Sequence, residues 1–206
     1  MPLVITFIPY ADDRNLGAAY NECMEMLPPD GWGVLLDHDV MFTTREWHRQ
    51  IADAIATVPE GCFSGVTNRI KCPFQNVEGV DMKNHDMRYH RDWGKKLLGN
   101  LTLRDVTDEV RTPSGFLICL SKQAWLDIGK FPNGLHYLDR TIWTALRAVG
   151  RRLYIIEGLY VYHWHRGGGP DSEPFVAGEW VKRHQLPDGR VVAWKEPPGG
   201  FPVYVG

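Results

Sequence analysis

The sequence predicts an α/β fold, with a single domain built on a mixed, mostly parallel sheet flanked by helices in the Rossmann-like manner. Short apolar runs of strand length alternate with longer stretches whose apolar residues recur every three or four positions. Turns rich in Pro and Gly separate these stretches. A length of 206 residues fits one domain of ordinary size, and the sequence contains no internal repeat.

Composition and charge narrow the classes of protein to which the chain can belong. Hydrophobic residues make up 44% and charged residues 23%, which is typical of a globular protein. The net charge of −2 gives no overall electrostatic case for binding nucleic acid or membranes. No apolar run reaches transmembrane length, so we expect no membrane-spanning segment, and the first eight residues suit a strand better than a signal peptide.

The four cysteines favour a reducing compartment. None lies in a C-x-x-C pair, which argues against a zinc ribbon or a thioredoxin-like motif. Cys23 and Cys119 lie in apolar runs, as buried structural thiols do. We therefore expect a cytoplasmic protein.

The first half of the chain is predicted to alternate strands and helices. The first strand ends at Pro9, and the helix after it has apolar residues spaced by four, three and four positions. A hydroxyl-capped helix begins near Thr43 and ends before Pro59. The predicted elements of this half are strands at 3–8, 34–36 and 62–66 and helices at 16–27 and 43–58.

Residues 69–104 form the least regular part of the sequence, and we predict no regular element there. This segment holds eight Lys and Arg against four acids, which leaves about +4 here and about −6 in the rest of the chain. Two interpretations stay open. The segment is either a solvated insertion or a loop on the acceptor side of a site, where it would meet an anionic partner.

The second half continues the alternation towards a strand that carries histidines. Ser121 is suited to capping a helix, and Pro187-Asp-Gly189 predicts a β-turn. The glycine-rich break at 166–170 makes residues 167–206 a C-terminal tail or lid of the same domain. The predicted elements of this half are strands at 116–120, 153–156 and 160–165 and helices at 121–128 and 139–149.

The strand at 34–36 runs directly into Asp37, His38 and Asp39. In open α/β sheets, ligands bind beyond the carboxyl ends of such strands. Two carboxylates with one residue between them can share a divalent cation, and oxygen ligands suit Mg²⁺ or Mn²⁺. The alternative is that Asp37 and Asp39 cap the next helix or solvate a turn, while His38 faces solvent.

Four local motifs occur in an order that resembles a known family. They are Asn15-Leu-Gly-Ala-Ala-Tyr-Asn21, Leu36-Asp-His-Asp39, the block from Phe131 through Asp139 to Arg147-Ala-Val-Gly150, and Tyr162-His-Trp-His-Arg166. Together they resemble the GT-A glycosyltransferases, in particular the family 2-like group. The resemblance covers roughly residues 3–166, so residues 1–166 are expected to form a GT-A-like catalytic domain.

The resemblance implies a metal-dependent glycosyltransferase that moves a sugar from a nucleotide-diphosphate sugar, expected to be a UDP-sugar, to an acceptor hydroxyl with inversion. Asp37 and Asp39 would hold Mn²⁺ or Mg²⁺, and a histidine of the last strand would complete the metal site. His163 matches the family position, and His165 faces the same way two residues on. Asp139 would be the catalytic base, although an Asp at a helix start is also suited to capping the helix.

The donor is expected to contact residues near the first helix. These cofactor-binding candidates are Tyr10, Arg14, Asn15, Gly17, Asn21 and Asp37. Asn15 is also suited to capping that helix, and Arg14 to lying on the surface. The acceptor stays open between a glycan, a lipid-linked sugar, a protein and a modified nucleic acid.

Two rival functions stay open. One is a metal-dependent hydrolase of a sugar nucleotide or phosphoester, which would use Asp37, Asp39, His163 and His165. The other is a non-catalytic binding module on a trimmed GT-A scaffold. That alternative is motivated by the short path from the first strand to Asn15, where members of the family have a further helix and strand.

Overall fold

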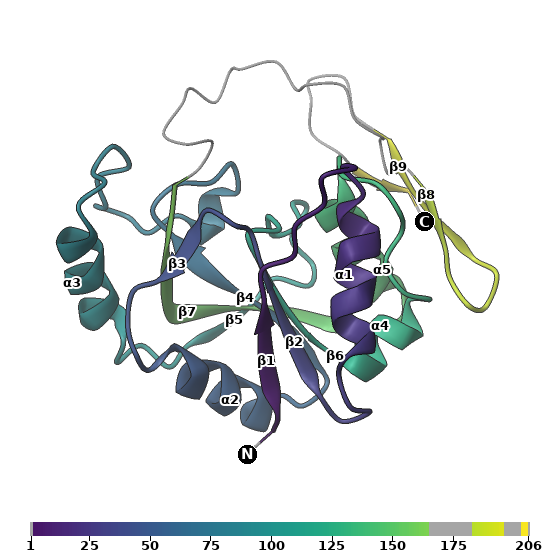
Figure 1. Cartoon of the computed structure of the whole chain (residues 1–206), viewed down its shortest axis with the longest axis horizontal. Coiled ribbons are helices and arrows are strands. Elements are labelled where there is room, and N and C mark those ends of the chain that lie inside the picture. Colours follow the sequence, from purple (N-terminus) through teal and green to yellow (C-terminus); the bar gives the residue numbers. More distant parts are fainter. Residues whose placement is uncertain (1, 165–182, 196–202, 206) are drawn as a thin grey trace.

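A computed structural model describes residues 2–164, 183–195 and 203–205. The chain forms a twisted central sheet with helices packed against both faces (Figure 1). The helices are α1 (Leu16–Glu25), α2 (Trp47–Thr57), α3 (Met87–Leu97), α4 (Lys122–Asp127) and α5 (Leu138–Ala148), with a 3-10 turn η1 at Pro73–Gln75. Within the described ranges, no helix is long and apolar enough to cross a membrane.

The central sheet has the strand order β1-β2-β6-β4-β7-β3, and β5 also pairs with β7. A second, smaller sheet has the order β10-β9-β8. The strands are β1 (Val4–Phe7), β2 (Trp32–Leu36), β3 (Val40–Phe42), β4 (Gly61–Thr67), β5 (Leu103–Asp105), β6 (Leu117–Ser121), β7 (Arg152–His163), β8 (Arg183–Gln185), β9 (Val191–Lys195) and β10 (Val203–Val205).

The predicted α/β class and the mixed sheet are confirmed, but the expectation of mostly parallel pairing is wrong. β1 pairs with β2 and β4 with β7 in parallel, whereas β6 lies antiparallel between β2 and β4. β3 and β5 are antiparallel to β7. The reason is that the chain re-enters the sheet at Leu117, opposite Leu36, so β6 starts at the edge where β2 ends.

The two faces of the sheet bury separate apolar clusters. On one face, α2 contributes Ile51, Ala54 and Ile55, which the spacing of its apolar residues predicted. On the other face, α1, α4 and α5 contribute large side chains such as Met24 and Trp125, both almost fully buried. Both faces are covered, which explains why β2 and β4 are buried at every position.

Three elements differ from the sequence-based expectations. α3 lies inside the segment that we expected to be irregular, because its polar composition hides the few residues that face β7. β3 has three residues, too few for a clear pattern, and it pairs with the end of β7. The strands expected at 153–156 and 160–165 are one strand, β7, whose pairing with β4 shifts register where the sequence has Glu157-Gly158.

The predicted β-turn is confirmed as the connection between β8 and β9. Leu186 and Val192 from this hairpin are buried in the same cluster as α5, and His184 Nε2 contacts the carbonyl of Ile128. The hairpin is therefore packed on the main body of the protein. Residues 167–182 of the expected tail or lid lie outside the described part of the chain.

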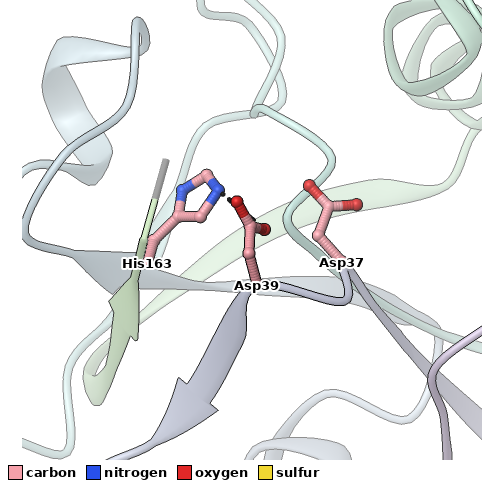
Figure 2. Close-up of side chains that lie close together, drawn as sticks. All are labelled: Asp37, Asp39 and His163. Atoms are coloured by element: carbon pink, nitrogen blue, oxygen red, sulfur yellow. Dashed lines mark ion pairs between the residues drawn. The ribbon is translucent and has the colours of Figure 1, made fainter. Parts of the chain in front are cut away.

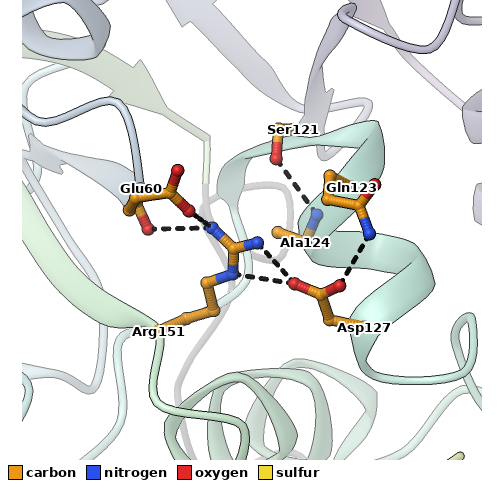
Figure 3. A network of polar contacts seen from close by, with 6 residues as sticks. All are labelled: Glu60, Ser121, Gln123, Ala124, Asp127 and Arg151. Carbon is orange, nitrogen blue, oxygen red and sulfur yellow. Dashed lines mark hydrogen bonds and ion pairs between the residues drawn. The ribbon is translucent and has the colours of Figure 1, made fainter.

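A charged cluster joins three elements where β4 and β7 begin (Figure 3). The guanidinium of Arg151 contacts Glu60 and donates from Nε to Asp127 Oδ2 at 3.0 Å. Asp127 also accepts from Gln123 Nε2 at 2.8 Å, and Ser121 Oγ caps α4 as predicted. The side chain of Arg151 is 12% exposed, so the cluster fixes the end of α4 against the amino ends of two strands.

Candidate metal centre

The aspartate motif forms a tight turn between β2 and β3. Asp37 N–H donates to the carbonyl of Phe116, and Val40 N–H donates to the carbonyl of Asp37. Since β3 follows directly, the alternative that Asp37 and Asp39 cap a helix is wrong. β2 and β7 run in the same direction within the sheet, so the turn lies at the edge where β7 also ends.

His163, the last residue of β7, is held in place from two sides. Its N–H donates to Asn68 Oδ1 at 2.8 Å, and Asn68 Nδ2 donates to the carbonyl of His163 at 3.2 Å. Thr67 Oγ1 donates to the same amide oxygen, and the ring of Phe116 stacks on the imidazole at 5.6 Å. The imidazole is almost fully buried, so its orientation is fixed before any ligand binds.

Asp37, Asp39 and His163 converge at this edge (Figure 2). One potential ligand atom from each of the three lies within 4.8 Å of the others. Ligand bonds of about 2.1 Å place opposite ligand atoms of an octahedral ion about 4.2 Å apart, so a small side-chain adjustment makes the set fit Mg²⁺ or Mn²⁺. His163 Nε2 lies 3.3 Å from Asp39 Oδ1.

The two carboxylates have different electrostatic surroundings. Burial raises the pKa of Asp37 to about 7, the charges of Asp39 and Asp139 act in the same direction, and His163 opposes them. Burial also acts to raise the pKa of Asp39, but the hydrogen bond and charge of His163 hold that pKa below its ordinary value. The centre thus concentrates negative charge that a divalent cation would neutralise.

Asp139 lies close enough to the centre to affect the pKa of Asp37. Tyr137 is the N-cap of α5 and Asp139 is in the first turn, so the cap alternative for Asp139 is wrong. Gly115 N–H donates to Oδ2 at 3.0 Å and Arg140 N–H to Oδ1 at 2.8 Å. Burial raises the pKa of Asp139, against the opposing charge of Arg140 and these backbone hydrogen bonds.

Gly115 is required by this arrangement. A Cβ at Gly115 would lie 2.6 Å from the Cβ of Asp139, so a larger residue would displace the carboxylate. Sequence reasoning did not identify Tyr20, whose pKa is raised by burial and by the charges of Asp37 and Asp139. Tyr20, Asp37 and Asp139 therefore share one electrostatic environment.

Asn15 and Gly17 hold the start of α1 against the loop that precedes α5. Asn15 Oδ1 accepts from Ala18 N–H, which confirms the capping alternative, and also from Gly134 N–H at 2.9 Å. A Cβ at Gly17 would lie 1.9 Å from the carbonyl oxygen of Pro132. The two residues therefore have structural roles, and donor binding by them stays a prediction.

Asn21 extends the same contact. Its Oδ1 accepts from Trp125 Nε1 at 2.9 Å and from Phe131 N–H at 2.8 Å, while its Nδ2 donates to the carbonyl of Phe131. Both ends of the amide are thus engaged by protein groups. A role of Asn21 in donor binding also stays a prediction.

Tyr10, Arg14 and His38 lie in segments that follow β1 and β2, at the end of the sheet that carries the metal centre. Tyr10 is 79% exposed and Arg14 has a left-handed backbone conformation, both in the segment between β1 and α1. β1 is parallel to β2, so this segment starts at the edge that carries the metal centre. His38 is exposed, as expected. His165 lies outside the described residues.

Comparison of the chain with protein-family models found no match, and comparison with curated proteins found none. The geometry of the centre is therefore the basis for assigning a function. That geometry places two carboxylates, a fixed imidazole and a third buried carboxylate at one edge of a mixed sheet.

Proposed function

We propose that this protein is a metal-dependent glycosyltransferase that moves a sugar from a nucleotide-diphosphate sugar to an acceptor hydroxyl with inversion. The observation that carries the proposal is the convergence of Asp37, Asp39 and His163 at the carboxyl edge of the sheet. Asp139, with its raised pKa, supplies a separate carboxylate in the same environment. The order of motifs along the chain, which resembles the GT-A family, supports the same function.

The three converging residues would hold Mn²⁺ or Mg²⁺ through carboxylate oxygens and the Nε2 of His163. When bound, the ion supplies positive charge that stabilises a departing diphosphate. Asn68 holds the backbone of His163 and Phe116 stacks on its imidazole, so the ligand set is oriented in advance. Asp39 Oδ1 and His163 Nε2, which lie 3.3 Å apart, would both turn towards the ion.

Asp139 would accept the proton of the attacking hydroxyl. A base is most effective when its pKa lies near the working pH, and burial moves the pKa of Asp139 upward towards that range. The N–H groups of Gly115 and Arg140 orient the carboxylate, and each oxygen keeps a lone pair for the acceptor. Attack in line with the departing diphosphate inverts the configuration at the sugar carbon.

The donor would lie over the rim formed by Tyr10, Arg14 and the start of α1, with UDP as the expected nucleotide. A glycan, a lipid-linked sugar, a protein and a modified nucleic acid are the classes of acceptor to test. The same centre could also serve a hydrolase, in which water replaces the acceptor hydroxyl.

The test is turnover of UDP-, GDP-, TDP- and CMP-sugars by the full chain with Mn²⁺ or Mg²⁺. We expect release of the nucleotide product from one donor, complete loss with EDTA, and loss in Asp39→Asn. Asp30→Asn is the matched control, since Asp30 is exposed in the turn before β2, at the opposite end of that strand from the centre.

The alternatives give different results. A hydrolase turns over the donor at full rate without an acceptor, whereas a transferase is accelerated when its acceptor is added. A binding module shows a donor-dependent rise in Tm with no product. Absence of both turnover and any metal-dependent rise in Tm would refute the proposal.

A further inference from the structure

The outer side of α3 carries a row of exposed cations. Arg88, Arg91 and Lys95 recur at spacings of three and four, which places them along one side of the helix, and Lys83 is exposed in the loop before it. The inner side is anchored on β7 by His90, whose Nδ1 lies 2.7 Å from Tyr160 Oη. We call these four cations the α3 ridge.

In the part of the chain that the structure describes, the two arginines of the α3 ridge are not paired with acidic side chains. Within the described residues, Arg88 and Arg91 form no ion pair, whereas Lys95 pairs with Asp92 at 3.2 Å. Asp81 and Asp86 are the other acids nearby, and their carboxylates accept from the backbone N–H groups of Lys83 and Arg88. An exposed cationic row on a chain of net charge −2 is a local asymmetry that attracts anions.

The α3 ridge begins beside the metal centre. His85, directly before α3, lies with Nδ1 2.7 Å from Tyr162 Oη, and the ring of His90 lies 4.4 Å from the ring of Tyr162. Tyr162 precedes the ligand candidate His163. Figure 1 shows α3 and its preceding loop beside the end of β7 that carries this histidine.

An aromatic side chain lies at the same end of β7. Trp164 is 49% exposed, and its N–H donates to the carbonyl of Asp39 at 2.9 Å, which ties its backbone to the metal centre. An exposed indole ring is suited to stacking on a planar ring. The centre is thus flanked by the α3 ridge on one side and by Trp164 at the strand end.

We propose that the α3 ridge and Trp164 form a binding surface for single-stranded nucleic acid. Arginines match phosphate oxygens in two-point hydrogen bonds, and single-strand binders combine such cations with aromatic rings on which bases stack. A polyanion without bases would use the ridge and leave Trp164 without a partner, and a base within a duplex is not free to stack on it. Binding of nucleic acid does not depend on the transfer reaction. Use of the bound nucleic acid as the acceptor rests on the proposed function.

The test is fluorescence anisotropy of labelled single-stranded DNA and RNA of about 20 nucleotides, in EDTA and without any sugar donor. We expect micromolar binding near 50 mM salt that weakens steeply towards 200 mM, as counterion release requires for about three phosphate contacts. The double variant Arg88→Glu/Arg91→Glu should bind at least about tenfold more weakly, with a shallower dependence on salt. Because the assay contains neither metal nor donor, its failure is distinguishable from failure of the transferase proposal.

The matched control is Arg183→Glu/Arg190→Glu, which makes the same charge change in the β8–β9 hairpin, away from α3 (Figure 1). It should bind within about twofold of the unmodified chain if charge position matters more than net charge. Trp164→Ala should weaken binding of the oligonucleotide about tenfold and leave binding of inorganic polyphosphate unchanged. The proposal is overturned by absence of binding at low salt, by an equal loss in the control, by tighter binding of duplex, or by polyphosphate binding as tight as that of the oligonucleotide.

Discussion

The two ends of β7 hold charged clusters of opposite character. Before the strand begins, Arg151 lies between Asp127 and Glu60, so a permanent cation faces two carboxylates (Figure 3). Where the strand ends, Asp37 and Asp39 share the imidazole of His163. The first cluster contains a permanent cation among its own side chains, and the second contains none.

The cluster before β7 is suited to stabilising the fold, and the cluster at the end of β7 is suited to function. Although burial opposes it, the hydrogen bond and charge of Asp127 hold the pKa of Arg151 above its ordinary value, as expected for a satisfied ion pair. At the other end, burial and neighbouring carboxylates raise the pKa of Asp37 to about 7, which is a cost to the folded state. Strongly perturbed groups of this kind concentrate at functional sites.

The largest expected effect is loss of turnover at the carboxyl end. Asp39→Asn removes one anionic ligand, so we expect kcat/KM to fall by about 10³-fold with Tm nearly unchanged. Steady-state kinetics with Mn²⁺ and a thermal melt without metal measure the two quantities. Turnover that survives in Asp39→Asn would mean that this end of β7 does not bind the catalytic metal.

The next effect is loss of stability at the amino end. Arg151→Met leaves the carboxylate of Asp127 without its cation in a partly buried position, so we expect the free energy of unfolding to fall by about 3 kcal/mol. Denaturant unfolding measures this change, and activity per folded molecule should be unchanged. Arg151→Lys keeps the charge and should recover part of the loss. A lower kcat with unchanged stability would contradict the division between the two ends.

A third effect tests the cost of the raised pKa of Asp37. The folded state keeps a proton that the unfolded chain releases near pH 4, so stability should fall as pH rises from about 4 to 7 and then level off. Asp37→Asn cannot titrate, and without metal it should be more stable than the unmodified chain at pH 8 by about 2 kcal/mol, with little difference near pH 4. Urea unfolding in EDTA across this range measures both curves. Parallel curves would show that Asp37 carries no such cost.

The smallest effect sharpens the description of the amino end. Glu60 is 82% exposed, so its ion pair with Arg151 is screened, and Glu60→Gln should change stability by at most about 0.5 kcal/mol. Asp127→Asn, at the less exposed partner, should cost about 1 to 2 kcal/mol. Comparing the two by denaturant unfolding identifies which carboxylate balances Arg151. Equal losses of stability in the two variants would mean that solvent exposure does not determine how strongly each carboxylate interacts with Arg151.

The elements with strong apolar periodicity were predictable from sequence, and those held by tertiary contacts were not. α2 has a clear buried stripe, and the helix is confirmed, but it begins at Trp47 after the N-cap Glu46, so the hydroxyl cap expected near Thr43 is wrong. Thr43 Oγ1 instead donates to the carbonyl of Tyr160. α3 was missed because its contacts with β7 depend on His90, a polar residue that pattern reasoning places on the surface. β3 was missed because its three residues gain their order from pairing with β7.

The residues of the candidate site that lie at the end of a predicted strand were predictable from the sequence. Asp37 and Asp39 follow a buried strand, so their place at its carboxyl end was predictable, whereas His163 was named from the resemblance of its motif to a known family. Asn68, which fixes His163, gave no such signal, because its partner is 95 residues away in the chain. Asn21 was named as a donor ligand because the sequence did not show that its amide bonds to Trp125 and Phe131, which lie 104 and 110 positions later in the chain.

The bonds that join α1 to the second half of the chain have a consequence for the order of folding. Asn15 and Asn21 bond to residues 119 and 110 positions later in the chain, so these contacts have a high contact order. Since long-range contacts form late, α1 leaves the ribosome well before the residues that it contacts and is among the last helices to be fixed. At a synthesis rate of about 5 to 20 residues per second, its apolar face stays exposed for several seconds until Phe131 and Gly134 emerge, an interval in which a chaperone would bind it.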